Sequence, residues 1–412
     1  MLTWAVPFNI CCFLDSHSYG SSPATFECLL AAGAVEIFTA TAGDAFSGLK
    51  EWSAGREDWL IGHFGFDLAK ETEPIKGNTS FADPIGFPDL AFFVPEHLVL
   101  LQKDSIRIGS LGADPNVVWQ QILGTPPAVA RPAAAPPSFT PRFTREEYLS
   151  TVGALRRHIL RGDCYEINFC QEFFDEAADI DPYSTWWALS QASPNPFAAF
   201  YQVGERFLLC SSPERFLKRA GDTLYSQPIK GTAPRHLQDG AADLLQRERL
   251  YRSGKDRAEN VMVVDLVRND LARVCRPGTV RVAELFGIYP FPQVYQMIST
   301  VVGEMLPGLD WTDAIRACFP MGSMTGAPKN RVVQLIAQYE RSRRGLFSGA
   351  VGYRSPTGDF DFNVVIRSLL YNRADRYLSY QVGSGITFYS DADAEYAECL
   401  VKAEGIRKAL HL

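Results

Sequence analysis

The sequence lacks the paired cysteine spacing of zinc sites and redox motifs, since none of its nine cysteines is followed by another after two residues. Disulfide frameworks are typical of short secreted chains with an even number of cysteines, whereas this chain has 412 residues and an odd number. We therefore expect buried, inert thiols and a reducing compartment, the cytoplasm.

Basic runs and long apolar runs are also missing. Acidic residues outnumber basic ones by 47 to 40, which argues against a general nucleic-acid binder. No stretch reaches about 18 apolar residues, so no membrane span is expected. The apolar first 20 residues lack a positively charged beginning and are interrupted by Pro7, Asn9 and Asp15, which favours a buried strand over a signal peptide.

What the sequence does contain divides it into three parts. Residues 124–142 are rich in proline and alanine and predict an extended linker. Residues 1–123 predict a strand-rich region packed on the core, in which Pro95 is expected to split the apolar run Ala91–Leu101 into two strands. Residues 143–412 mix helical and strand patterns without βαβ alternation, so the predicted fold class is α+β.

Local patterns predict several elements of the larger region. Thr144 and Glu147 form a capping box for a helix that runs to about Arg161. Further helices are predicted at residues 254–273, at 327–339 and from about 391. Alternating and apolar runs predict strands at residues 164–174, 207–217, 223–229, 347–354, 360–371 and 377–382, the last three as consecutive antiparallel strands.

Two helical stretches carry carboxylates three residues apart, Asp256 with Glu259 and Glu395 with Glu398, so that each pair shares a helix face; Lys402 extends the second face. Such a pair can hold Mg²⁺, which takes one or two carboxylates plus water and substrate oxygens. By spacing alone, a solvated charged face explains each pair more readily. The pairs form a metal site only if the fold brings the helices together.

Lys230 stands in the stretch SQPIKGTAPR, between turn formers that would hold its side chain in place. An ordinary loop lysine explains this setting as well. Arg367 is surrounded by apolar residues on a predicted strand next to that of Tyr353, where an arginine requires either an internal ion pair or a ligand carboxylate. Gly383 and Gly385 would let a ligand approach the backbone closely.

The order of these motifs resembles one family. From about Thr144 to the end, SSPERF, PIKGT, ENVMVVDLVRNDL, GSMTGAPK, GAVGY, VVIRS and GSGITFYSDADAEYAE together resemble the chorismate-utilising enzymes. These include the first components of anthranilate synthase and aminodeoxychorismate synthase, and isochorismate and salicylate synthases. The resemblance implies one large α+β fold, with two packed antiparallel sheets, outer helices and a site in the central cleft.

The resemblance also implies a role for each candidate residue. Glu259 and Glu398 would hold Mg²⁺, with Asp256 and Glu395 near, and the ion would bind the ring carboxylate of chorismate. Glu214 of SSPERF would be the general acid that protonates the departing C4 hydroxyl. Tyr353 and Arg367 would hold the pyruvyl carboxylate, and the other residues implied to bind substrate are Thr232, Gly383, Ser384, Gly385 and Lys402.

Within the family, PIKGT resembles the aminodeoxychorismate synthases, because anthranilate synthases usually have alanine in place of Lys230. The lysine amine would attack C2 and expel the C4 hydroxyl; ammonia would then attack C4 and expel the lysine. This implies 4-amino-4-deoxychorismate as the product, for p-aminobenzoate and folate synthesis. Because the amine must be neutral, burial and Mg²⁺ are expected to lower the pKa of Lys230.

Two positions depart from the family. Glu166 stands where amine-using relatives commonly have glutamine and water-using ones lysine, and the missing lysine argues against isochorismate or salicylate synthesis. Gln296 stands where many relatives have histidine, so we assign no base there. The sequence has no glutaminase motif, so ammonia is expected from a glutamine amidotransferase partner subunit. The alternatives are an anthranilate synthase component I and, because Phe13–Ser16 resembles a tryptophan-site motif, a non-catalytic sensing subunit.

Overall fold

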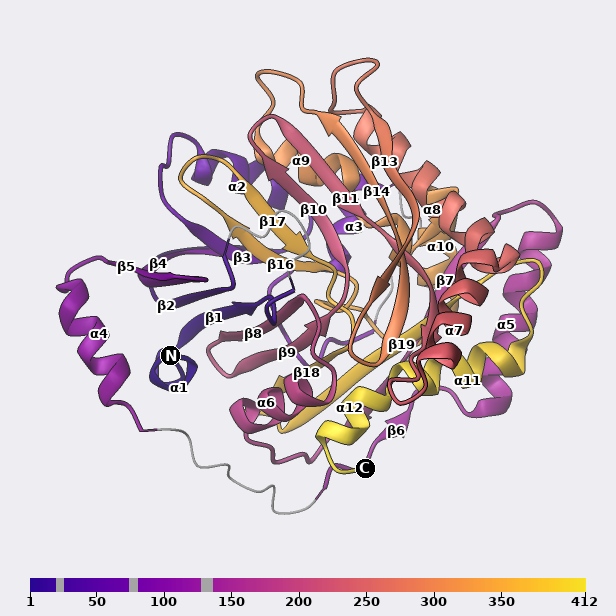
Figure 1. The fold of residues 1–412 in the computed structure, drawn as a ribbon, viewed down its shortest axis with the longest axis horizontal. Helices are drawn as coiled ribbons and strands as arrows, with labels where there is room; N and C mark the ends of the chain where they lie inside the picture. Colours follow the sequence, from indigo (N-terminus) through magenta and orange to yellow (C-terminus); the bar gives the residue numbers. More distant parts are fainter. Residues whose placement is uncertain (20–25, 74–80, 127–135) are drawn as a thin grey trace.

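The computed structural model describes residues 1–19, 26–73, 81–126 and 136–412. Within these ranges, nineteen strands bond into one network in which the neighbouring strands are antiparallel (Figure 1). The predicted linker lies partly outside the described residues, at 127–135. No helix of the described ranges combines the length and apolar character needed to cross a bilayer.

The network extends in two directions from one long strand pair, β2 (Cys28–Ala40) and β4 (Leu90–Gln102). The first arm contains, in order, β1 (Ile10–Asp15), β8 (Phe197–Val203), β9 (Arg206–Ser212), β18 (Ser368–Asn372), β19 (Tyr377–Ile386) and β7 (Glu166–Asp175), with β6 (Thr140–Pro141) and β15 (Gly326–Ala327) beside β7. The second contains β3 (Leu60–Phe64), β16 (Ala350–Arg354), β17 (Phe360–Asn363), β10 (Arg215–Ala220), β11 (Thr223–Gln227) and β14 (Val294–Glu304), with β12 (Ile229–Pro234) and β13 (Arg281–Pro290) beside β14. A last strand, β5 (Ser105–Ser110), pairs with β4.

Both arms can extend from the β2–β4 pair because the strands of this pair are bent. The pairing of β2 with β4 shifts its register between Ala34 and Glu36, opposite Pro95, and such a bulge bends the strands that contain it. The prediction that Pro95 splits the run is therefore wrong, because β4 continues through the proline as one strand. A proline at a bulge removes a hydrogen bond that the irregular pairing does not need.

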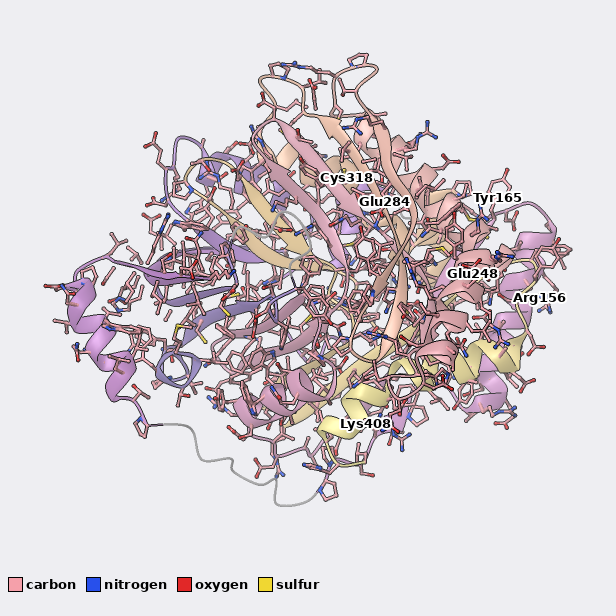
Figure 2. All side chains as sticks on the ribbon, in the orientation of Figure 1. Arg156, Tyr165, Glu248, Glu284, Cys318 and Lys408 are labelled. Atoms are coloured by element: carbon pink, nitrogen blue, oxygen red, sulfur yellow. The ribbon has the colours of Figure 1, made fainter. Side chains whose placement is uncertain are left out.

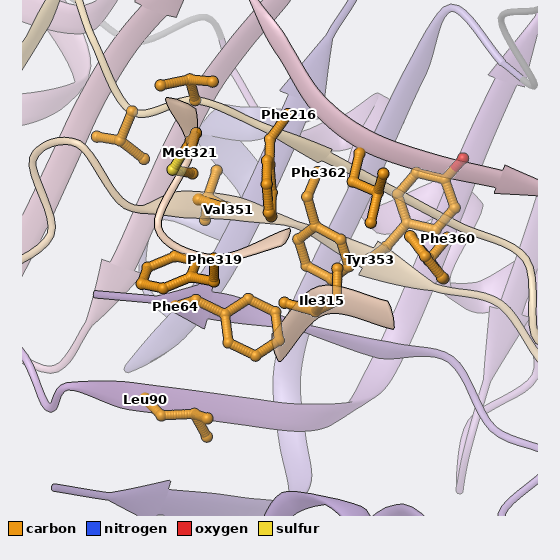
Figure 3. Packing of buried hydrophobic residues seen from close by; sticks show 14 of the residues in the cluster. Phe64, Leu90, Phe216, Ile315, Phe319, Met321, Val351, Tyr353, Phe360 and Phe362 are labelled. Atoms are coloured by element: carbon orange, nitrogen blue, oxygen red, sulfur yellow. The ribbon is translucent and has the colours of Figure 1, made fainter. Parts of the chain in front are cut away.

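Alternate residues of the first arm face two different cores. Cys12 of β1 belongs to the inner core, which contains residues of both arms, whereas Cys11 belongs to an outer core beneath the helices of the first arm. In the inner core the ring of Phe362 stacks on Trp311, with centroids 6.2 Å apart, and meets Phe64 edge-on at 5.3 Å. Figure 3 shows how the side chains of β3, β16 and β17 meet in this layer.

The helices lie outside the strands, and the α+β fold of packed antiparallel sheets is confirmed. Helices that cover the outer core are α4 (Pro115–Gly124), α5 (Arg145–Leu160), α6 (Pro182–Ala192), α10 (Lys329–Tyr339), α11 (Ala392–Lys402) and α12 (Glu404–Ala409). Those that pack on the second arm or the long pair are α2 (Ala45–Ser53), α7 (Gly240–Arg252), α8 (Gly254–Ala272) and α9 (Trp311–Cys318). Short helical segments complete the chain: α1 (Leu2–Ala5), α3 (Ala69–Thr72), η1 (Phe66–Leu68) and η2 (Gly322–Met324).

The capping box of Thr144 and Glu147 opens α5 as predicted. In contrast, the strands predicted at 207–217 and 360–371 are each two strands. Each break is a crossover between the arms, from β9 to β10 and from β17 to β18. The crossovers are bonded to each other, since Val364 donates its N–H to the carbonyl of Glu214 at 3.0 Å. This joint between the arms carries Glu214 and Arg367.

Candidate active site

A cavity of about 800 Å³ opens beside the two crossovers. It lies among β12, β19, α8 and α11, which come from distant parts of the sequence. Most of the predicted site residues line it: Glu214, Lys230, Thr232, Asp256, Glu259, Arg367, Gly383, Gly385, Glu398 and Lys402. Segments almost 190 residues apart in the chain therefore contribute to one cavity.

Ser384 and Glu395 do not line the cavity. Ser384 alternates with the two glycines of β19 and so faces the opposite side, where its hydroxyl lies 3.5 Å from that of Tyr148. Glu395 is buried and lies with its carboxylate 3.8 Å from the amine of Lys255.

Tyr353 also lies away from the cavity. It belongs to β16 and lines a separate pocket of about 70 Å³, with its ring 5.0 Å from that of Phe26. The expected pairing with Arg367 fails because β16 pairs with β17, and Arg367 lies beyond the end of that strand. The aromatic residues that line the cavity are Phe347 and Phe291, which have no polar group and gave no sequence signal.

Arg367 has a backbone φ of +54°, a left-handed conformation that is rare for residues other than glycine. Within the described ranges its guanidinium makes no hydrogen bond or ion pair. Burial lowers its pKa, and the carboxylates of Glu398 and Glu214 oppose this effect. The internal ion pair that the sequence left open is thus absent from the described residues, and Arg367 presents an unpaired cation to the cavity.

Lys230 is positioned by a bulge in β12. The register of β12 with β14 shifts between Ile229 and Thr232, so Lys230 and Gly231 lie in the irregular part. Gly231 has a φ of +93°, and a Cβ there would lie 2.9 Å from the side chain of Asp256. Only glycine therefore fits beside the lysine.

The Lys230 amine lies 2.5 Å from Oε1 of Glu166. Burial lowers the pKa of Lys230, but the carboxylates of Glu166, Glu259 and Glu214 outweigh this effect and raise it above its ordinary value. The expectation of a lowered pKa is therefore wrong for the protein without ligands. The sequence did not reveal the cause, because Glu166 is 64 residues away in the chain.

Glu214 is buried at the crossover, and burial raises the pKa of its carboxyl to about 7, although a hydrogen bond with Ser323 works in the opposite direction. The group is therefore largely protonated just below neutral pH, as a general acid requires. Ser323 also lines the cavity. It lies in the GSMTGAPK motif of the family resemblance, to which no role was assigned.

The fold brings the two carboxylate pairs together. The amine of Lys255 on α8 lies 3.9 Å from Oε1 of Glu259 and 3.8 Å from Oε1 of Glu395 on α11, so one cation spans both helices. Burial raises the pKa of Glu259 to about 7. On α11, Glu398 is 2.6 Å from the amine of Lys402, which donates to the carbonyl of Gly383.

The residues present fit a magnesium ion. Among the described residues there is no cluster of three or more metal-binding side chains. Magnesium does not need one, because waters and substrate oxygens complete its coordination. Asp256, Glu259 and Glu398 line the same cavity, and the buried Oε1 of Glu259 has no hydrogen bond to any described residue. A buried carboxylate oxygen of this kind favours a cationic ligand.

The two departures from the family have defined contacts. Gln296 accepts a hydrogen bond of 2.8 Å from the hydroxyl of Thr232, and thereby orients a side chain of the cavity wall. The carboxylate of Glu166 contacts the amine of Lys230, and the residue is only 2 % exposed.

This chain is similar in sequence and in structure to several known proteins. Aminodeoxychorismate synthase component 1 of Klebsiella aerogenes is 36 % identical over 349 residues, which cover 84 % of this chain and 76 % of that protein. Anthranilate synthase component 1 of Pseudomonas putida is 32 % identical over 386 residues, with coverage of 89 % and 76 %. The crystal structure of anthranilate synthase component I from Streptococcus pneumoniae superimposes with a TM-score of 0.81 and 27 % identity, and covers 94 % of this chain and 93 % of that one.

A family match covers nearly the whole chain, including the long strand pair and the residues that line the cavity. Residues 15–408 match the family described as chorismate binding enzyme. The chain belongs to the chorismate binding enzyme family.

Proposed function

We propose that this chain is the first component of an aminodeoxychorismate synthase and converts chorismate and ammonia to 4-amino-4-deoxychorismate, for p-aminobenzoate and folate synthesis. Relatives of that name share 36 % identity over 84 % of the chain. The single observation that carries the choice within the family is Lys230, whose amine lies in the wall of a cavity shared with Glu214 and Arg367.

Chorismate carries two carboxylates, and the cavity offers a place for each. The unpaired guanidinium of Arg367 binds the pyruvyl carboxylate. Glu259 and Glu398 would hold Mg²⁺, with Asp256 near, and the ion would supply positive charge to neutralise the ring carboxylate. Gly383 and Gly385 leave space for the ring against β19.

Lys230 supplies the nucleophile. Its neutral amine bonds to C2, both ring double bonds shift by way of C1, C6 and C5, and the C4–O bond breaks. Glu214 donates its proton to the departing hydroxyl, which leaves as water, because hydroxide alone is a poor leaving group. Ammonia then bonds to C4, both ring double bonds shift back, and the C2–N bond to Lys230 breaks. Two displacements place nitrogen at C4.

Anthranilate synthase component I is the second candidate, because relatives of that name also match most of the chain. Product analysis with chorismate and an ammonium salt separates the two. Anthranilate fluoresces directly, whereas aminodeoxychorismate yields p-aminobenzoate only after a lyase is added. Turnover by the isolated chain also eliminates a purely sensing role.

The partner is a second component, since the relatives are each named component 1. We infer that it is a glutamine amidotransferase, which would supply ammonia to the cavity. All nine cysteines lie in the described ranges and are free thiols, in accord with a reducing compartment, the cytoplasm.

The test of the proposed chemistry is mass spectrometry of the protein with chorismate and Mg²⁺ but without ammonia. We expect Lys230 to gain the mass of chorismate less one water. In Lys230→Ala the adduct should be absent and amination at C4 reduced by at least about 100-fold. Normal aminodeoxychorismate formation by Lys230→Ala would refute the assignment.

A further inference from the structure

Glu166 lies where β7 enters the interior. Its neighbour Tyr165, labelled in Figure 2, is 69 % exposed, whereas Glu166 is 2 % exposed. The backbone of Glu166 pairs with β15 on one side, where a Cβ on Gly326 would lie only 2.1 Å from its carbonyl oxygen. Its position is therefore set by close backbone packing rather than by a flexible loop.

The carboxylate is directed at Lys230. Oε1 lies 2.5 Å from the lysine amine, while the buried Oε2 has no hydrogen bond to any described residue. A Cβ on Gly385 of β19 would lie 2.7 Å from Oε1 and 3.0 Å from the amine. The pair thus occupies the space that a side chain at position 385 would need.

The lysine cannot begin the reaction in this paired form. Its protonated amine has no lone pair for C2, so a proton must leave before the C–N bond forms. The other charged groups of the cavity come from the two crossovers, α8, α11 and α12: Glu214, Arg367, Lys255, Asp256, Glu259, Glu398, Lys402, Glu404 and Lys408. Glu214 has the opposite task of donating a proton, and Glu259 and Glu398 would hold the cation. Among the described residues, the group that accepts a hydrogen bond from the amine is the carboxylate of Glu166, at 2.5 Å.

We propose that Glu166 is the proton acceptor of Lys230. This inference rests on the proposed function. One proton moves from the amine to Oε1, which leaves a neutral amine and a neutral carboxylic acid. The amine then attacks C2. When ammonia bonds to C4 and the C2–N bond breaks, the released neutral amine takes the proton back from Glu166, and the ion pair is restored.

A proton acceptor within the ion pair predicts a specific pH dependence for the rate of adduct formation at Lys230. A proton that moves within the pair does not enter the bulk solvent, so the rate of adduct formation in the wild type should not require deprotonation by solvent. In Glu166→Gln, solvent must take the proton from the Lys230 ammonium. The rate of adduct formation should therefore rise about tenfold for each unit by which the pH is raised. The wild-type to Glu166→Gln ratio of rates should therefore fall about tenfold per unit between about pH 5.5 and 7.5. Because it is a ratio, the titration of Glu214 cancels.

The measurement is rapid-quench mass spectrometry of the Lys230 adduct with chorismate and Mg²⁺. Glu166→Asp keeps a carboxylate and should retain the wild-type pH dependence at a lower rate. Glu176→Gln removes an exposed charge just beyond the same strand and should match the wild type in both. A wild-type to Glu166→Gln ratio that is constant with pH would overturn the proposal.

A second measurement needs no chorismate. Acetic anhydride labels neutral amines, so peptide mass spectrometry should find Lys230 acetylated about tenfold faster in Glu166→Gln than in the wild type at neutral pH. Equal labelling would overturn the proposed pairing. Faster labelling without any wild-type adduct would refute the proposed function and the acceptor role together, but leave the ion pair standing.

Discussion

At the scale of single residues, the surroundings of a glutamate, rather than its residue type, distinguish the proposed acid from the partner of the proposed nucleophile. Glu214 and Glu166 are both buried glutamates near Lys230, yet only Glu166 forms an ion pair with it. Burial raises the pKa of Glu214 to about 7 and so keeps a transferable proton on it. The motif SSPERF predicts the acid, but no local pattern predicts the partner of Lys230.

The raised pKa of Glu214 gives the first prediction at this scale. The acid must be protonated, and its protonated fraction falls as pH rises through about 7, so adduct formation should decrease about tenfold per unit above that pH. Glu214→Gln has no proton to donate and should form the adduct about 10²–10⁴ times more slowly. Chorismate binding by calorimetry is the control and should change little. An undiminished rate at pH 9 would contradict the assignment.

The unpaired guanidinium gives a second prediction. Arg367→Met removes the cation that we propose binds the pyruvyl carboxylate, so KM for chorismate should rise at least about tenfold. Steady-state kinetics measures this. Arg268→Met, which removes an exposed arginine of α8, is the matched control and should leave KM unchanged. An unaltered KM in Arg367→Met would place the carboxylate elsewhere.

At the scale of elements, irregular segments carry the proposed nucleophile, the proposed acid and the unpaired arginine. Lys230 lies in the bulge of β12, and Glu214 and Arg367 lie in the crossovers. Periodicity predicted the regular parts, such as α5 with its capping box. It read residues 207–217 and 360–371 as continuous strands because apolar residues continue through both breaks. A strand that changes partners keeps its apolar pattern, so the pattern cannot reveal the change.

Gly231 provides the prediction at this scale. Gly231→Ala would place a Cβ 2.9 Å from Asp256 in a left-handed backbone, so it should lower the free energy of unfolding by more than the 1–2 kcal/mol of the backbone cost alone. It should also reduce adduct formation at Lys230. Gly221→Ala is the control, because Gly221 has a similar φ of +58° with nothing within 4 Å. Denaturant unfolding compares the two, and equal losses would show that Asp256 imposes no constraint.

At the scale of the whole molecule, the inner core joins the two arms. The family resemblance implied packed sheets, but the sequence did not indicate that they share β2 and β4, nor that Tyr353 faces a different pocket from Arg367. These features depend on which strands pair across the fold. Such pairings involve residues far apart in the chain, which local periodicity does not record.

A substitution of Phe362 tests how much the inner core contributes to the stability of the fold. It is fully buried between Trp311 and Phe64, so Phe362→Ala should lower the free energy of unfolding by about 3–5 kcal/mol. Guanidinium unfolding measures the change. Ile37→Ala, at a half-exposed position of β2, should alter it by only about 0.5 kcal/mol. A loss below about 1 kcal/mol in Phe362→Ala would mean that the core relaxes into the space.

The bonded crossovers have a consequence for how the protein matures. Since the proposed acid and the guanidinium both lie where the polypeptide passes from one arm to the other, neither arm alone would bind chorismate as we propose. The substrate site would form only when the two arms have packed together. A partly folded chain would therefore have no activity on chorismate, rather than a less specific one.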